Sequence, residues 1–540
     1  MLTYNMDERG DTPLYQYLYR RIRDDILSGV LSTGERLPSK RSLAEHLRVS
    51  VVTVEGAYGQ LEAEGYVYTR PKRGVYVDWV EQRPPAVDAQ GDGRAITDRN
   101  RVPSIGRALP QRAEIPPERA GTAQVHTGRT GEHAGGTGEH TGRTGEHEET
   151  ASEHRLKLPE RTDTVRGERP PAWRLDLGSN RTDPALFPAS AWARLVRRTL
   201  SEEDLLEVPP HQGLERLRRA IAADLRSYRG IAADADQIVV GAGAEYLYIL
   251  LAQLLGPSAV IALEDPGYPK IRMVYQKCGA VCVNVPMDRQ GIGIEALARS
   301  GAAAAHISPA HHYPTGVVTP IGRRHALLRW AAEGKNRWII EDDYDSEFRS
   351  AGRPLPAMAS VDTAGRVIYM NTFSQTISPA LRVGYMVLPP RLLETYRREL
   401  GFYACTVPAL EQHVLARFLE EGTYERHLSR MRKEYRTRRA AVLDAFRRCA
   451  FAGRVRVVEQ GAGLHFLLRL DTAETDEALL QRGEELGVRL RFLSQFAALP
   501  REEFAHTLVV NYAPLPPHRL PEAMDLLEQA LFPPNTGIEP

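Results

Sequence analysis

Side chains able to take part in chemistry gather in five short segments of the second half of this 540-residue chain. The segments read Gly241-Ala242-Gly243-Ala244-Glu245, Asp265-Pro266-Gly267-Tyr268, Tyr313-Pro314-Thr315-Gly316, Asp342-Asp343-Tyr344 and Thr372-Phe373-Ser374 with Arg382. Each lies at the end of, or soon after, an apolar run. If those runs are strands of a mostly parallel sheet, ligands gather where the strands end. The segments therefore predict a binding site for a small molecule.

Two adjacent histidines, His311 and His312, precede the Pro-Thr-Gly turn and are further candidates for ligand contact. Imidazole titrates near neutral pH and both donates and accepts hydrogen bonds. Adjacent residues on a turn usually point in different directions, so we expect at most one of the two to line the site. The sequence does not say which one.

Nucleophilic and metal-binding side chains are scarce. Lysine occurs only at positions 40, 72, 157, 270, 277, 335 and 433, because the basic residues are almost all arginine. The four cysteines, at 278, 282, 405 and 449, are scattered, and Cys278 and Cys282 lack a second pair or a nearby histidine to complete a zinc site. We therefore expect neither structural disulfides nor structural zinc, and no metal site.

The elements that must position these residues are predicted over 172–534. Short apolar runs alternate there with helical stretches, namely QIVV at 237, AVIALE at 259, VCVNVP at 281, RWIIED at 337 and RVIYMN at 366. This alternation is typical of an α/β domain with a mostly parallel sheet wrapped by helices. We expect a large subdomain at about 210–390 and a small C-terminal one at about 391–534.

Between about 80 and 171 the chain is rich in Arg, Glu, Gly, Thr and Pro and has hardly any large apolar residue. This composition predicts a disordered linker. Within it TGRTGEH occurs twice, and histidines recur every seven residues at 126, 133, 140 and 147. The favoured interpretation is a repeat-expanded spacer; metal binding by these histidines is the alternative, opposed by the glycines between them.

Residues 12–79 have the pattern of a small helical domain with a hairpin. One helix face is predicted by Leu14, Tyr15, Leu18, Ile22 and Ile26, which recur at spacings of three and four. Two shorter helices follow, capped by Ser39 and Ser50, with apolar faces made of Leu43, Ala44 and Leu47 and of Val54, Ala57, Tyr58 and Leu61. The stretch GYVYTRPKRGVYV at 65–77 predicts a β-hairpin, or wing, with a basic tip.

This arrangement fits a helix-turn-helix that binds double-stranded DNA. Basic residues lie at helix starts and at the hairpin tip, where they can reach phosphates, while the start of the third helix would face base edges. The candidate DNA-binding residues are Arg36, Ser39, Lys40, Arg41, Ser50, Val52, Thr53, Arg70, Lys72, Arg73 and Gly74. Glu55 lies on the same third helix. A charged helical adaptor that never touches DNA is the alternative, and the basic wing tip argues against it.

The composition of the whole chain limits the remaining classes. The chain has 42% hydrophobic and 26% charged residues and a formal net charge of +1, so DNA binding must be local. Its polar start, MLTYNMDERGD, lacks the apolar core of a signal peptide, and no apolar stretch of about 20 residues occurs. We therefore expect a cytoplasmic protein without a membrane partner.

The stretch from PLYQYLYRRI to YTRPKRGVYV resembles the GntR-type winged helix over its whole length. Two positions depart from that pattern. Val51 stands where the family usually has arginine after the serine that opens the third helix, and Arg48 replaces the glycine of the helix turn. These departures affect which operator sequence is read, not the fold.

The five segments of the large domain resemble, in order and spacing, the fold-type I aminotransferases that use pyridoxal phosphate. Together with the winged-helix part, here called the head, the whole chain resembles the MocR/GabR regulators. The resemblance implies that the backbone N–H groups of Ala244 and Glu245 meet the cofactor phosphate at a helix start, where the helix dipole favours anions. Thr372 and Arg382 would complete this phosphate-binding site, called the phosphate cradle below.

The same resemblance implies roles around the cofactor ring. Tyr268 would stack on the pyridine, Asp342 would pair with its protonated nitrogen, and Tyr344 would hydrogen-bond its hydroxyl. Tyr313 and Ser374 are carried over as further cofactor-binding residues.

Two positions lack the side chains that catalysis would need. Gln375 stands where the family motif has lysine after the Thr-Phe-Ser triplet, and an amide nitrogen cannot form a Schiff base. Lys270 is a weak candidate to replace that lysine, the alternative being contact with a ligand carboxylate. Val509 stands where a related segment commonly supplies an arginine for the substrate carboxylate.

The favoured hypothesis is a homodimeric transcription regulator. Its large domain would bind pyridoxal phosphate, pyridoxamine phosphate or a related effector, such as an amino acid, without covalent attachment or turnover. One alternative is an active aminotransferase with an appended DNA-binding head. The other is a domain that has lost the cofactor and serves only to dimerise. The sequence does not reveal the operator, the regulated genes or the direction of regulation.

Overall fold

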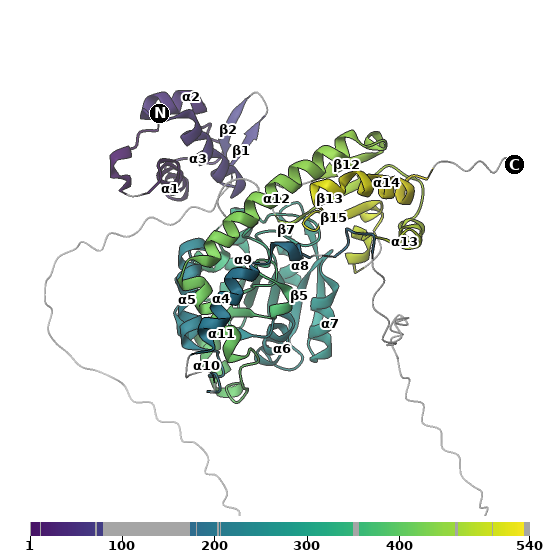
Figure 1. The fold of residues 1–540 in the computed structure, drawn as a ribbon. Helices are drawn as coiled ribbons and strands as arrows, with labels where there is room; N and C mark the ends of the chain where they lie inside the picture. Colours follow the sequence, from purple (N-terminus) through teal and green to yellow (C-terminus); the bar gives the residue numbers. More distant parts are fainter. Residues whose placement is uncertain are drawn as a thin grey trace, which may run out of the picture. The chain divides into compact units, whose positions relative to one another are not determined.

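The computed structural model describes residues 2–10, 12–70, 73–78, 173–179, 181–201, 205, 207–348, 356–458, 463–498 and 501–533 (Figure 1). The predicted linker over 80–171, with its repeat histidines, lies outside the described residues, as does Lys72.

The N-terminal part contains the predicted helices and hairpin. Its elements are α1 (Leu14–Leu27), α2 (Lys40–Leu47), α3 (Val51–Ala63), β1 (Val67–Arg70) and β2 (Gly74–Val77), preceded by a 3₁₀ turn at Met6–Arg9. The predicted apolar faces of α2 and α3 are buried throughout. On α1, Leu18, Ile22 and Ile26 are buried, whereas Leu14 and Tyr15 at the helix start are half-buried.

The turn that joins α2 to α3 passes through Arg48, whose backbone has a φ of 54° and a ψ of 40°. This left-handed conformation costs a residue with a Cβ atom roughly 1–2 kcal/mol, which explains why glycine is usual here. Ser50 follows, and its hydroxyl accepts the backbone N–H of Thr53 at 3.1 Å, which starts α3 at the predicted cap.

A sheet of eight strands lies at the centre of the large domain. In chain order the strands are β4 (Ile238–Gly241), β5 (Val260–Asp265), β6 (Val281–Asp288), β7 (Gly291–Ile292), β8 (Ala304–Ile307), β9 (Trp338–Asp342), β10 (Val367–Thr372) and β11 (Gly384–Val387). Their order in the sheet is β4-β11-β10-β9-β8-β5-β6-β7. Pairing is parallel from β10 to β6 and antiparallel at both edges, which confirms the mostly parallel sheet.

Helices cover both faces of this sheet. Ile261 and Leu263 of β5 pack in one apolar cluster with α6 (Ala244–Leu255) and α7 (Pro269–Lys277). The intervening Ala262 packs in a second cluster with α8 (Ile294–Arg299) and α9 (Ile321–Glu333). Successive side chains of a strand point to opposite faces, so two helical layers bury the sheet between them.

Further helices and a smaller sheet complete the domain. The remaining elements are β3 (Leu175–Asp176), α4 (Ala189–Thr199), α5 (Glu215–Tyr228), α10 (Pro390–Glu399), α11 (Ala409–Glu420), α12 (Thr423–Arg448), β12 (Val455–Val458), β13 (His465–Leu470), α13 (Asp476–Glu485), β14 (Val488–Arg489), β15 (Thr507–Asn511) and α14 (Leu520–Leu531). Strands β12, β13 and β15 form an antiparallel sheet, and β3 pairs with β14.

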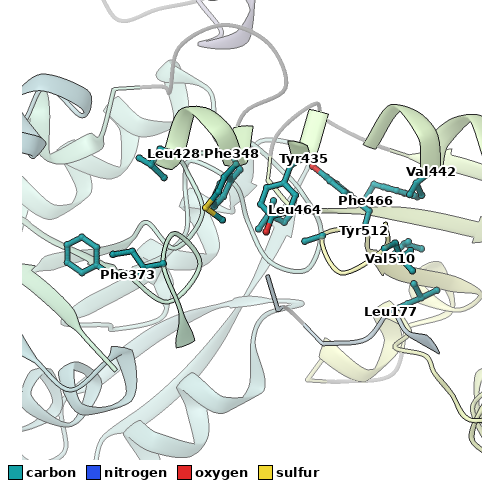
Figure 2. Packing of buried hydrophobic residues seen from close by; sticks show 14 of the residues in the cluster. Leu177, Phe348, Phe373, Leu428, Tyr435, Val442, Leu464, Phe466, Val510 and Tyr512 are labelled. Carbon is teal, nitrogen blue, oxygen red and sulfur yellow. The ribbon is translucent and has the colours of Figure 1, made fainter. Parts of the chain in front are cut away.

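The long helix α12 joins the two subdomains through one apolar core. Figure 2 shows Leu428 of α12 near Phe373, and Val442 of the same helix near Phe466 of the small sheet. Tyr435 lies between them, with its ring centroid 5.3 Å from that of Phe348. A core continuous through both subdomains keeps the strand ends of the large sheet in a fixed position against β13 and β15.

Among the described helices, none is both long enough and apolar enough to cross a membrane.

Candidate functional site

Loops at the carboxyl ends of the parallel strands bring several predicted site residues together. Tyr268 follows β5, Tyr313 follows β8 and Tyr344 follows β9. The ring centroid of Tyr313 lies 5.9 Å from that of Tyr268 and 6.3 Å from that of Tyr344. Tyr268 is 42% exposed, so a face of its ring is accessible for stacking. The loops after these three strands thus bring the three tyrosine rings close together.

Asp342 ends β9 and is buried at this site. Its Oδ2 atom accepts a hydrogen bond from the Tyr248 hydroxyl at 2.7 Å and lies 3.3 Å from Nε2 of His306. The other ring nitrogen of His306 lies 2.8 Å from the Tyr275 hydroxyl. Tyr248 and His306 therefore orient the carboxylate through Oδ2, and Tyr275 orients His306. A fixed, buried carboxylate suits the protonated ring nitrogen of a pyridine.

Sequence analysis did not identify Tyr248, Tyr275 and His306. Tyr248 lies one helical turn after Ala244 on α6, a spacing that places both on one helix face. That spacing was a usable signal. His306 had none, because β8 was not predicted as a strand.

The predicted phosphate cradle lies at the start of α6. Gly243 caps this helix with a φ of 82° and no side-chain hydrogen bond, so the first N–H groups of Ala244 and Glu245 have no partner within the helix. A Cβ atom at Gly243 would lie 2.9 Å from Nη2 of Arg382, so glycine is what lets the guanidinium approach. Thr372, at the end of β10, is buried beside these elements.

Glu245 places a negative charge in this cradle. Its carboxylate accepts from Lys270 Nζ at 2.7 Å and from Arg382 Nη2 at 3.2 Å. The Lys270 hydrogen bond, together with the charges of Lys270 and Arg382, holds the pKa of the Glu245 carboxyl below its ordinary value. The same bond raises the pKa of Lys270. Lys270 is therefore a protonated ion-pair partner, which argues against its acting as a substitute nucleophile.

Gln375 lies in the turn that follows β10, next to Ser374, whose backbone N–H donates to the Thr372 hydroxyl at 3.4 Å. In the sequence, residue 375 lies three residues after Thr372 and seven residues before Arg382. The side chain at this position is an amide, and its nitrogen cannot attack an aldehyde carbon to form a Schiff base.

The two histidines of the Pro-Thr-Gly turn point in different directions. His311 lies 3.1 Å from the Tyr344 hydroxyl, so it faces the site. His312 instead contacts the Thr315 hydroxyl at 2.8 Å and Glu264 at 3.5 Å. Burial lowers the pKa of His312 to about 3 and raises the pKa of Glu264 to about 8, so both groups are neutral near pH 7.

The position expected for a carboxylate-binding arginine is apolar. Val509 lies on β15, is 1% exposed and packs with Leu467, Leu493 and Phe496. Its backbone N–H donates to the carbonyl of Arg491 at 2.8 Å. A side chain buried in such a cluster has no means of holding a carboxylate.

In the winged-helix part, the predicted DNA-contacting residues differ in how firmly they are held. Arg36, Arg41, Arg70 and Arg73 are exposed, and Val52 is 75% exposed. Arg70 lies over the rings of Tyr68 and Tyr76, at 5.4 and 5.2 Å.

Four of the predicted DNA-contacting residues are engaged in hydrogen bonds within the protein. Lys40 Nζ donates to Glu55 at 2.7 Å. The Ser39 and Ser50 hydroxyls accept backbone N–H groups as helix caps, and the Thr53 hydroxyl lies 2.8 Å from that of Ser50. Gly74 begins β2 with a φ of 114°, and a Cβ atom there would lie 3.0 Å from Nε of Arg36. This glycine therefore brings Arg36 up to the wing.

Replacing Arg73 by alanine is expected to weaken DNA binding about equally for all sequences. An arginine that contacts one phosphate contributes about 0.9 to the slope of log K against log salt concentration. Binding of the Arg73→Ala variant to a duplex of random sequence, measured over a series of salt concentrations, should show a slope smaller by that amount. Arg20→Ala, on α1 outside the predicted contact set, is the control; equal slopes for wild type and Arg73→Ala would contradict the prediction.

Two family models match the chain. The model for bacterial regulatory proteins of the gntR family matches residues 14–77, and the model for aminotransferase class I and II matches residues 173–522.

Known proteins are similar either to nearly the whole chain or to its large domain. The chain is 32% identical over 531 residues to the probable rhizopine catabolism regulatory protein MocR of Rhizobium meliloti, covering 98% of this chain and 95% of that protein. It is 33% identical over 436 residues to the pyridoxine biosynthesis transcriptional regulator PdxR of Corynebacterium glutamicum, covering 80% and 79%. Among solved structures it resembles LysN, the alpha-aminoadipate aminotransferase of Thermus thermophilus, with a TM-score of 0.58, 26% identity and coverage of 66% and 92%.

Proposed function

Because the chain belongs to the MocR family of HTH-type transcription regulators, which join a GntR-type head to an aminotransferase-like domain, we propose that this domain is a non-catalytic sensor of a phosphorylated B6 vitamer. The head binds operator DNA. The large domain binds pyridoxal phosphate or pyridoxamine phosphate reversibly, and the bound state changes how the head engages DNA.

The observation that carries this proposal is the combination of a retained ring site with an amide at residue 375. Asp342, held by Tyr248 and His306, and the exposed ring of Tyr268 fit the pyridine of the vitamer. When bound, such a cofactor supplies an electron-withdrawing ring for reactions of amino acids. Gln375 provides no amine to anchor it, and Val509 no cation to capture a substrate carboxylate. Recognition is kept while the groups for turnover are missing.

In this proposal each residue has a defined task. Asp342 accepts a hydrogen bond from the protonated ring nitrogen, Tyr268 packs on the ring face, and Tyr344 donates a hydrogen bond to the ring hydroxyl. Backbone N–H groups of Ala244 and Glu245, with Thr372 and Arg382, receive the phosphate. Tyr313 and Ser374 complete the set of side chains around the bound vitamer. Pyridoxamine phosphate suits the site because it carries its own amine.

We further propose that the large domain forms a homodimer and so sets the spacing of two heads on operator half-sites. Coupling between vitamer and DNA is then an equilibrium property, and each ligand must change the affinity for the other by the same factor. Operator affinity measured with and without saturating pyridoxal phosphate tests this. Equal affinities, with the vitamer demonstrably bound, would refute the sensing role.

One observation favours a second candidate function. The Glu245 carboxylate already forms an ion pair with Arg382, the side chain that would otherwise contact the phosphate. This favours a domain that has lost the cofactor and serves as a dimeriser. Equilibrium titration of the protein with pyridoxal and pyridoxamine phosphates separates the two functions, since the second one requires that neither binds.

Replacing Glu245 by glutamine is expected to tighten the binding of pyridoxal phosphate. The change removes a negative charge that faces the phosphate and frees Arg382 and Lys270 to contact it. Half-exposed charge pairs are worth up to about 1 kcal/mol, so a gain of up to about 5-fold in affinity is expected for the phosphorylated vitamer. Unphosphorylated pyridoxal is the control ligand and should be unaffected; a weaker affinity of Glu245→Gln for pyridoxal phosphate would show that the carboxylate helps binding.

A further inference from the structure

Three side chains capable of binding a metal ion meet behind the Pro-Thr-Gly turn. His311 follows β8, Asp345 follows β9 and His465 begins β13, so three separate parts of the chain contribute. One donor atom of each lies within 4.8 Å of the others, and the residues are 3%, 2% and 3% exposed. The ring centroids of the two histidines are 4.6 Å apart.

The hydrogen bonds in this cluster leave one of its buried acceptors without a donor among the described residues. Nδ1 of His311 lies 2.9 and 3.1 Å from the two oxygens of Asp345 and 3.1 Å from the Tyr344 hydroxyl. A neutral imidazole carries one N–H, so it serves only one of these contacts at a time. Nδ1 of His465 is buried in the same cluster and has no hydrogen-bond partner among the described residues. A cation would satisfy the carboxylate and both lone pairs together.

His465 is already oriented as a ligand. Its Nε2 lies 3.0 Å from the carbonyl oxygen of Pro314 and donates its proton there, which fixes the ring and directs the Nδ1 lone pair into the cluster. Histidines that bind metals typically donate their other N–H to a carbonyl or carboxylate in this way. A hydrogen-bonded His311–Asp345 pair alone would not require His465 to present a bare nitrogen.

We propose that His311, Asp345 and His465 bind one divalent transition-metal ion, with zinc the ion best suited to two imidazoles and a carboxylate. Zinc bonds of about 2.0–2.2 Å place tetrahedral ligand atoms roughly 3.3–3.5 Å apart. The three donor atoms lie within 4.8 Å of one another, so small side-chain shifts would bring them to that spacing. Three protein ligands leave a fourth position open for water or another ligand. This site goes beyond the proposed vitamer sensing, which requires no metal.

Cobalt(II) titration of the full-length protein, stripped of metal with a chelator, tests the site directly. The expected result is one Co²⁺ per chain in a tetrahedral or five-coordinate environment, seen as visible d–d absorption, which zinc displaces. Asp345→Asn and His465→Ala should each weaken this binding by more than about 100-fold, beyond the roughly 10- to 100-fold that loss of an outer hydrogen-bond partner costs. Unchanged cobalt spectra in both variants, or no such absorption in the wild type, would overturn the proposal.

Two controls separate this site from other histidines. A variant with alanine at the four repeat histidines, 126, 133, 140 and 147, should keep the absorption, as should His518→Ala, which removes an exposed histidine outside the cluster. Loss of the absorption in the repeat variant alone would place the metal in the repeats and refute the site. If the cluster variants do not fold, the midpoint of thermal unfolding of the repeat variant decides. It should rise with added zinc, and a constant midpoint would contradict the proposal. Neither readout depends on whether a vitamer binds.

Discussion

The Gln375→Lys variant is expected to form a borohydride-trappable covalent bond to pyridoxal phosphate, whereas the natural protein forms none. The variant places a primary amine next to the predicted cradle, at the position where the aminotransferase motif carries lysine. Titration should produce a visible absorption band, and reduction should leave close to one equivalent of adduct on residue 375, located by peptide mass spectrometry. The natural protein should bind the vitamer reversibly and lose it on dialysis.

Gln375→Met is the matched control, because methionine resembles lysine in length but has no amine. It should show neither the band nor the adduct. Trapping of pyridoxal phosphate on any lysine of the natural protein at comparable yield would contradict the non-covalent mode. Steady conversion of an amino acid to its keto acid by the natural protein would also refute the absence of turnover.

Asp342→Asn is expected to weaken pyridoxal phosphate binding by roughly 10- to 150-fold. The carboxylate is buried and held by Tyr248 and His306, so it pairs with a protonated ring nitrogen at little cost in ordering. Hydrogen bonds to charged groups contribute about 1.5–3 kcal/mol, which corresponds to that range of affinity. Equilibrium dialysis or fluorescence titration measures the change, and an unaltered midpoint of thermal unfolding shows that the fold is intact.

An analogue with carbon in place of the ring nitrogen sharpens this test. The natural protein should bind the analogue more weakly than pyridoxal phosphate, while Asp342→Asn should bind both about equally. Tyr248→Phe keeps the carboxylate and loses one hydrogen bond to it, so a smaller loss, of about 10-fold or less, is expected. Equal binding of pyridoxal phosphate by the natural protein and Asp342→Asn would remove Asp342 from the site.

The MocR membership restricts what this protein does, and the proposed titrations test the rest. The family fixes DNA-binding regulation and an aminotransferase-like domain. Whether that domain senses a vitamer depends on two opposing features of the site, the retained carboxylate at Asp342 and the added carboxylate at Glu245. Asp342→Asn and Glu245→Gln change these features one at a time. The first is expected to weaken the binding of pyridoxal phosphate and the second to tighten it.

Several parts of the fold could be predicted from local pattern. The helix faces of α2 and α3, the hairpin and the strands β4, β5, β6, β9 and β10 follow from apolar spacing, because burial of one face or of a short run is recorded in neighbouring residues. β8 and β11 were missed. Both runs are only four residues long, and in Ala-Ala-His-Ile only Ile has a strong strand preference. Pairing with strands on both sides makes them strands.

The sequence by itself determined that residue 375 has no amine, because that is a property of one side chain and needs no neighbour. It also determined which residues lie at the ends of β4, β5, β9 and β10. Only the tertiary structure decided that Tyr248 and His306 hold Asp342, that Glu245 occupies Arg382, and that His311, Asp345 and His465 form one buried cluster. Such contacts join elements far apart in the chain. They depend on the order of the strands and on the packing of the two subdomains, which local periodicity does not record.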